Sequence, residues 1–290
     1  MLFFAKLKQD MTISSRRIRK IYSSLDKDQI KLVIDKKIEG KLEIQQWLEK
    51  LHKLAVMDTL GDDSRKKSGE LSIIFGLITA FTIILTISKP FMFFFPVGFF
   101  LLFFYFLIMY ITLNKIDIGN NLRFFIVPLL EHFKEENRID GPVFLNMDFS
   151  NPKNRKNIIH QTVDPERQRK LFQHHWMQGE MMFTDQVMIS WKIVDTVTDY
   201  GKNLQEKAGN RDLKKKNLVT HQLDLVFHVP KKRFDIEKPG PEVKDAGNYY
   251  EMNLNRSDTS DSLEVGMMPE TFLEAVREGY HYIRKKEVSI

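Results

Sequence analysis

Hydrophobic residues are concentrated in one island of this chain. Between Leu71 and Leu113 the only charged residue is Lys89. The second part of the island, residues 91–113, has 23 residues and carries no charge. As a helix it would rise about 34 Å, which exceeds the roughly 30 Å hydrocarbon core of a bilayer. The pattern predicts a transmembrane helix over 91–113.

A weaker apolar segment of 18 residues, 71–88, comes directly before it. The two segments together predict a transmembrane hairpin that turns at Ser88, Lys89 and Pro90. The alternative is a re-entrant or interfacial hairpin that never reaches the other side. A cleaved signal peptide is not expected, because the island begins only at residue 71.

Three threonines interrupt the first of these two segments. Thr79, Thr82 and Thr86 are spaced by three and four residues, so they share one face of a helix. Their hydroxyls can bond back to their own helix or across to a partner helix. Ion pathways often require an ionisable residue within the membrane, and neither segment contains one within its span. The threonine face therefore does not indicate a water-filled pore.

The positive charge lies before the apolar island. Residues 1–70 carry 16 Lys and Arg against 11 Asp and Glu, whereas residues 114–290 carry 27 of each. Basic residues near the ends of membrane spans tend to remain cytoplasmic, which predicts an integral membrane protein with both termini in the cytoplasm. The chain has no cysteine, which is compatible with a reducing compartment.

Periodicity before the island predicts helices. Apolar spacing favours helical structure over residues 12–60, with a break at Gly40 and an end at residues 61–64. The apolar stripe of this segment fits packing against the rest of the protein, or a coiled-coil or membrane-surface helix. After the island, residues 120–137 are expected to form a juxtamembrane helix.

From residue 141 onward the pattern changes to period two. Strict alternation over 187–197 and 219–229 predicts half-buried antiparallel strands. A strand over 177–184, a loop over 255–262 and a terminal helix from Pro269 complete this region. The expected fold is an α+β membrane protein, divided into a basic helical cytoplasmic segment (1–70), a transmembrane hairpin (71–113), a juxtamembrane helix (114–140) and a β-rich soluble domain (141–290).

Two polar residues interrupt the apolar faces of the strongest strands. If Trp191 pairs with Leu225, then Asp195 lies opposite His221. A cross-strand pair would satisfy both groups, and its plain interpretation is structural. A catalytic or pH-sensing pair is the alternative, but no nucleophile is evident nearby in the sequence.

The connection between these strands, residues 201–216, is rich in cations. They are Lys202, Lys207, Arg211, Lys214, Lys215 and Lys216. The plain interpretation is a solvated hairpin tip. The functional alternative is contact with anionic lipid headgroups, at about 1 kcal/mol for each cation near the surface. Nucleic acid is disfavoured, because Tyr200 is the one aromatic residue close by.

Motifs for cofactors, metals and catalysis are not found in the sequence. His174 and His175 are adjacent, and adjacent residues of a strand point to opposite faces, so they are poorly placed to hold one metal ion. No nucleotide-binding, zinc-protease or nucleophile-elbow motif occurs. We therefore expect no metal and no cofactor.

The function expected from these patterns is a membrane-anchored interaction or scaffold module, in which the hairpin tethers a β-rich domain that binds an unknown protein partner. The alternative is a homo-oligomeric pore or a transport-associated subunit. An enzyme is a third possibility for which the sequence offers no catalytic motif.

Overall fold

The computed structural model describes residues 16–88, 93–136, 139–162, 169–200, 217–237, 241–260 and 266–286. The chain is α+β and forms two compact units. The helical unit comprises residues 1–34 and 52–118, and the sheet unit comprises residues 35–51 and 119–290. Residues 52–118 are thus inserted into the sequence of the sheet unit.

The helical unit contains two short helices, residues 16–23 and α2 (Lys27–Asp35), followed by two long ones, α3 (Ile44–Ser88) and α4 (Phe94–Ile116). The first turns of α3, residues 44–51, belong to the sheet unit. The start of α2 is capped reciprocally, because Asp26 Oδ1 accepts from the Gln29 N–H at 2.8 Å and Gln29 Oε1 accepts from the Asp26 N–H at 2.9 Å.

The predicted helix end at residues 61–64 is wrong, because α3 continues through them as one helix of 45 residues. A single Gly61 costs a helix only about 1 kcal/mol. An ion pair between Arg65 and Asp62, 2.7 Å long and one turn apart, supports the helix at this point. Arg65 also pairs with Asp117, which follows α4.

Helices α3 and α4 pack antiparallel through two glycines. A Cβ atom on Gly69 would lie 3.3 Å from the Tyr110 ring, and one on Gly76 would lie 3.3 Å from the Phe103 ring. Each glycine therefore makes room for a large aromatic side chain, and the seven-residue spacing repeats the contact two turns along the pair. Among the described residues, α3 and α4 are the two helices long and apolar enough to cross a membrane.

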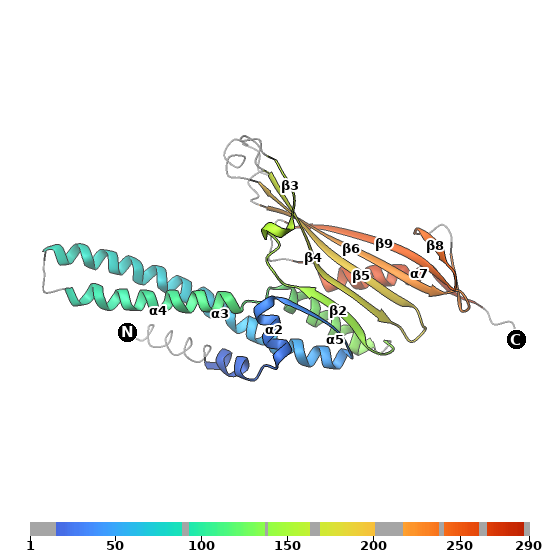
Figure 1. The fold of residues 1–290 in the computed structure, drawn as a ribbon, viewed down its shortest axis with the longest axis horizontal. Helices are drawn as coiled ribbons and strands as arrows, with labels where there is room; N and C mark the ends of the chain where they lie inside the picture. The colour runs from blue at the N-terminus through green and yellow to red at the C-terminus, as the bar shows by residue number, and fades with distance from the viewer. Residues whose placement is uncertain are drawn as a thin grey trace. The chain divides into compact units, whose positions relative to one another are not determined.

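The sheet unit contains an antiparallel sheet of eight strands in the order β1-β2-β4-β5-β6-β9-β8, with β3 paired to β4 (Figure 1). These strands are β1 (Lys37–Leu42), β2 (Val143–Asp148), β3 (Ile158–Gln161), β4 (Arg169–Met182), β5 (Met188–Tyr200), β6 (Asn217–Pro230), β8 (Val243–Ala246) and β9 (Tyr249–Ser260). A separate ribbon joins β7 (Phe234–Ile236) to β10 (Ile283–Lys285).

Helices cover one face of the sheet. They are a π-helical turn (Leu122–Ile126), α5 (Val127–Glu136) and α7 (Pro269–His281). The Phe125 ring packs edge-on against Trp176 of β4 with centroids 5.4 Å apart, and Trp191 of β5 packs against Phe272 of α7 at the same separation. This layer of aromatic side chains forms the core of the unit.

Several sequence predictions for this unit need correction. Residues 37–42 were expected to be helical, but Lys36 adopts a left-handed φ of 59° and the chain then pairs with β2 as β1. The loop expected over 255–262 is wrong as far as Ser260, because β9 pairs with β6 along its whole length. In both places tertiary pairing overrides weak local propensity.

Other predictions for the sheet unit are confirmed. The strand expected over 187–197 is part of β5 from Met188 onward, the strand expected over 219–229 lies within β6, and Trp191 pairs with Leu225. The terminal helix begins at Pro269 but ends at His281, where β10 follows.

Candidate functional site

The sheet carries a row of polar side chains across its helix-covered face. Asp195 on β5 lies directly opposite His221 on β6, as the register predicted. The His221 Nδ1 and Asp195 Oδ1 atoms are 2.7 Å apart, and the two residues are only 2% and 5% exposed. The geometry is a buried hydrogen-bonded pair, and a role for it as a site stays a prediction.

Two further residues extend this pair. The indole of Trp176 donates its Nε1–H to Asp195 Oδ1 at 3.1 Å. On the other side the Ser260 hydroxyl lies 3.2 Å from His221 Nε2. Because a carboxylate only accepts, Nδ1 of His221 donates to Asp195, and in the neutral ring Nε2 is then left to accept from Ser260.

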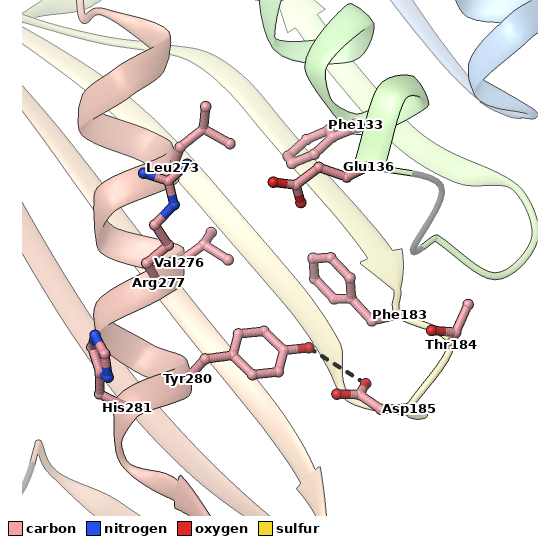
Figure 2. Close-up of a pocket in the computed structure, with 10 residues that line it drawn as sticks. All are labelled: Phe133, Glu136, Phe183, Thr184, Asp185, Leu273, Val276, Arg277, Tyr280 and His281. Carbon is pink, nitrogen blue, oxygen red and sulfur yellow. Dashed lines mark hydrogen bonds between the residues drawn. The ribbon is translucent and has the colours of Figure 1, made fainter.

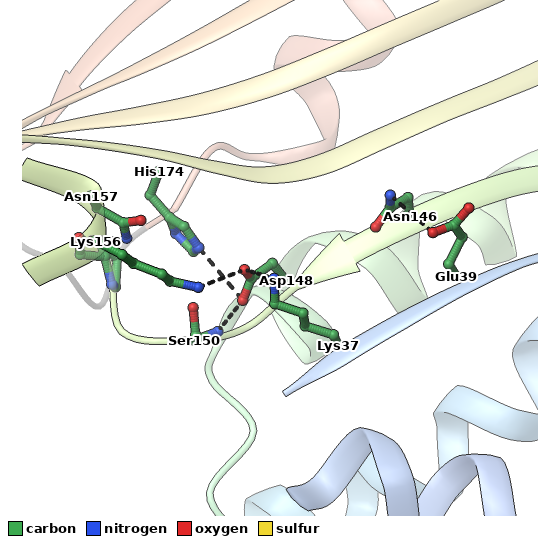
Figure 3. Close-up of polar contacts among 9 residues, drawn as sticks. Lys37, Glu39, Asn146, Asp148, Ser150, Lys156, Asn157 and His174 are labelled. Atoms are coloured by element: carbon green, nitrogen blue, oxygen red, sulfur yellow. Dashed lines mark hydrogen bonds and ion pairs between the residues drawn. The ribbon is translucent and has the colours of Figure 1, made fainter. Parts of the chain in front are cut away.

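The row continues on β4 with His174, which pairs in register with Asp195. His174 is 4% exposed, and among the described residues neither of its ring nitrogens has a hydrogen-bond partner. Its Nε2 atom lies 3.7 Å from Asp148 Oδ1 (Figure 3). Burial lowers the pKa of His174, and the nearby carboxylates of Asp148 and Asp195 oppose that shift only in part.

Asp148, the last residue of β2, forms ion pairs with two lysines at this end of the row. Lys37 Nζ lies 2.9 Å and Lys156 Nζ 3.4 Å from its Oδ2 atom, and the Ser150 N–H donates to its Oδ1 atom at 2.8 Å (Figure 3). Burial works against ionisation, yet the hydrogen bonds from Ser150 and Lys37 hold the pKa of Asp148 well below its usual value. The hydrogen bond to the Asp148 carboxylate in turn raises the pKa of Lys37.

The sheet unit also contains a pocket of about 380 Å³ between α5, α7 and the turn that joins β4 to β5 (Figure 2). Apolar and aromatic side chains line most of it: Phe133, Phe183, Leu273, Val276 and Tyr280. Four acidic or basic side chains also line it: Glu136, Asp185, Arg277 and His281. The Tyr280 hydroxyl donates to Asp185 Oδ1 at 3.4 Å. A pocket of this size and mixed character suits a small ligand or an inserted side chain.

In the helical unit the apolar side chains of α3 and α4 face outward. Leu77 is 68% exposed, Ile87 is 80% exposed and Phe94 is 82% exposed. The three threonines of α3 bond within their own helix: Thr79 donates to the Phe75 carbonyl at 2.7 Å, Thr82 to Thr79 at 3.0 Å and Thr86 to Thr82 at 2.8 Å. The sequence allowed these hydroxyls to bond to their own helix or to a partner helix, and in the structure they bond to their own helix.

Some residues singled out in the sequence lie outside the described residues. They are the cations of 201–216 together with Lys89 and Pro90, whereas Ser88 is the last residue of α3. Within the part of the chain that the structure describes, no group of three His, Asp or Glu residues is placed to hold a metal ion.

Sequence reasoning missed Ser260, His174 and Asp148 as members of the polar row. Ser260 was assigned to a loop, so its parity with His221 was not considered. The pairing of β6 with β9 has no strong signal in the sequence. This pairing sets Ser260 opposite Val219, which makes Ser260 the diagonal cross-strand neighbour of His221 on the same face.

Comparison with protein-family models, with curated proteins and with solved structures finds no match for this chain, so the geometry alone carries the functional argument.

Proposed function

We propose that this protein is a membrane-anchored interaction module. Helices α3 and α4 tether the chain to a bilayer as a hairpin, and the sheet unit binds a partner on the cytoplasmic side. One observation carries the proposal: both helices expose large apolar side chains along most of their apolar length. Soluble proteins rarely expose contiguous apolar surface of this extent, and lipid is the solvent that suits it.

The internal packing of the hairpin favours an anchor over a pore. The glycine contacts place the aromatic rings of α4 against α3 within one chain, and the threonine hydroxyls are satisfied by their own helix. A homo-oligomeric pore needs polar groups directed at a lumen or at a neighbouring copy. The pore is therefore the second candidate, and an oligomer of defined size in lipid nanodiscs would support it.

The pocket beside α7 is the part of the sheet unit best suited to a partner, because apolar side chains line it and charged groups surround it. The cations of 201–216 would add contact with anionic lipid headgroups. Flotation with vesicles that contain or lack phosphatidylserine tests this second contact, using the full-length chain and a Lys214→Gln, Lys215→Gln, Lys216→Gln variant.

The anchor is tested with the full-length chain in cell membranes. Wild-type protein should remain in the membrane pellet after alkaline carbonate extraction. A Leu77→Arg, Ile84→Arg variant should be released, because each central arginine costs insertion about 2.5–3.5 kcal/mol. The matched control is Ile34→Arg on α2, an equally exposed apolar position outside the apolar segments that should leave extraction unchanged. Release of the wild-type protein by carbonate would refute the anchor.

Topology can be tested without background, because the chain has no cysteine. Single cysteines at Ser23 and Lys244 should react with a membrane-impermeant maleimide only after the cytoplasmic side is opened. A cysteine at Lys89 should react from the opposite side. Reaction of all three from one side would contradict a hairpin that spans the bilayer and would favour a re-entrant one.

A further inference from the structure

Asp195, His221 and Ser260 form a hydrogen-bonded chain in the order acid, imidazole, hydroxyl. The atoms are Asp195 Oδ1, His221 Nδ1, His221 Nε2 and Ser260 Oγ, joined by distances of 2.7 Å and 3.2 Å. The same order of groups and ring nitrogens activates serine in hydrolases of unrelated folds, where it is recognised by geometry rather than by sequence position. We propose that Ser260 is a nucleophile that reacts with carboxylic esters.

The environment of His221 supports the role of a base. The ring is held between β5 and β9 with 2% of its surface exposed, and Asp195 fixes the tautomer in which Nε2 accepts from the Ser260 hydroxyl. Trp176 donates to the same carboxylate oxygen and so fixes the position of Asp195. Asp195 and Trp176 are positioning residues, and His221 is the group that takes the proton from Ser260.

Ser260 lies where a substrate can approach. It is half-buried at the end of β9, and the residues directly before it, 255–259, are exposed. Among the described strands, β8 covers only residues 249–252 of β9, so the outer edge of β9 beyond this pairing has no described strand beside it. Alternate backbone N–H groups along such an edge point away from the sheet and are donors of the kind that stabilise a developing oxyanion.

The reaction balances with water as the second substrate. Ser260 Oγ forms a bond to the ester carbonyl carbon while its proton moves to His221 Nε2. The bond to the alcohol oxygen then breaks, and the alcohol leaves with that proton. Water next attacks the acyl carbon, its proton passes through His221 Nε2 to Ser260 Oγ, and the free carboxylic acid departs.

The chain contains its own matched control on the opposite face of the same strands. Ser190 Oγ lies 3.5 Å from His228 Nε2, and His228 Nδ1 lies 3.7 Å from Glu251 Oε1. The order carboxylate, imidazole, hydroxyl and the ring nitrogen that faces each group are the same, with Glu251 in the place of an aspartate, and Ser190 is half-buried like Ser260. The longer distances and the more exposed His228 give no tight hydrogen-bonded chain, so we expect no activation there.

The test is covalent labelling of the full-length protein in nanodiscs with a fluorophosphonate probe, in which a phosphorus–oxygen bond replaces the phosphorus–fluorine bond and fluoride leaves. Expected is one adduct per chain, located by peptide mapping at Ser260. Labelling should be absent in Ser260→Ala and at least about 100-fold slower in His221→Gln, which lacks the base. Ser190→Ala and His228→Gln should label like wild type.

A second readout separates activation from structure. Hydrolysis of p-nitrophenyl acetate should follow the same order of variants, and Asp195→Asn should lower it, because an amide can donate to the ring and reverse its tautomer. Tryptophan fluorescence confirms that each variant is folded. The proposal is overturned if folded wild-type protein is not labelled, if the adduct lies on another serine, or if His221→Gln labels as fast as wild type. None of these outcomes bears on the membrane anchor.

Discussion

Substitution of Gly279 by alanine tests how α7 is seated on the sheet. Gly279 lies in the last turn of α7, and a Cβ atom there would lie 2.2 Å from Cζ of Phe227 and within 2.7 Å of two further ring atoms. Phe227 is fully buried on β6, so its ring has no open space to enter. We expect Gly279→Ala to destabilise the sheet unit even though alanine is the better helix former.

The sign follows from two opposing magnitudes. Replacing glycine by alanine inside a helix gains at most about 1 kcal/mol, and less near a helix end. Forcing a methyl group into a filled core costs typically about 1–3 kcal/mol. The net expectation is a loss of about 1–2 kcal/mol, or a fall in the melting temperature of roughly 2–8 °C for a unit of this size.

The assay is urea unfolding of the full-length protein followed by tryptophan fluorescence. All three tryptophans, at positions 47, 176 and 191, belong to the sheet unit, so the signal reports that unit alone. Gly40→Ala is the control, because its Cβ would meet Trp47 at an ordinary 3.5 Å, and it should not lower the midpoint.

A partner substitution isolates the clash. Phe227→Leu removes the ring atoms that a Cβ on Gly279 would meet, so the double variant should lose less than the sum of the two single variants, by roughly 1 kcal/mol. If Gly279→Ala is as stable as wild type, or if the two losses simply add, the close seating of α7 on Phe227 is refuted.

Three further predictions concern other parts of the molecule. Burial lowers the pKa of His174, so the folded state binds fewer protons than the unfolded state near that pKa. The free energy of unfolding should therefore fall as the pH drops below about 6.5. The difference between the urea midpoints at pH 7.5 and pH 5.5 should be smaller in His174→Gln than in the wild-type protein. Gly76→Leu should lower the melting temperature of helical circular dichroism by pushing the helices apart, while Gly98→Leu, where a Cβ meets nothing within 4 Å, should not. Arg65→Gln should speed hydrogen exchange at the Ile118 amide by roughly 5-fold, because it releases the ion pair with Asp117 that holds the end of α4 beside α3, worth about 1 kcal/mol at a partly exposed site.

The sequence predicted most reliably where one periodicity ran without interruption. The apolar segments and the alternation in β5 and β6 were long enough to give both the elements and their register, including Asp195 opposite His221. Period two alone determines which residues share a face, so a correct register delivers cross-strand neighbours as well.

The misses share a physical origin in contacts between distant parts of the chain. The strand β1 has only six residues and contains a glycine, so its pattern is too short to predict a strand, and it is a strand because β2, about a hundred residues later, pairs with it. The second half of β9 reads as a loop by composition, and only its pairing with β6 makes it a strand that carries Ser260 to His221. The pocket is likewise formed by α5, α7 and a turn, which no local pattern brings together.

The insertion of residues 52–118 into the sequence of the sheet unit has a consequence for biosynthesis. The first strand and the Trp47 indole leave the ribosome long before β2, to which they bind through the β1–β2 ladder and a hydrogen bond from Trp47 to the Val143 carbonyl at 3.0 Å. The sheet can therefore close only after the whole insertion has been made. Once the sheet has formed, the β1–β2 pairing should keep the two fragments of a chain cut within the insertion associated, although no covalent bond joins them.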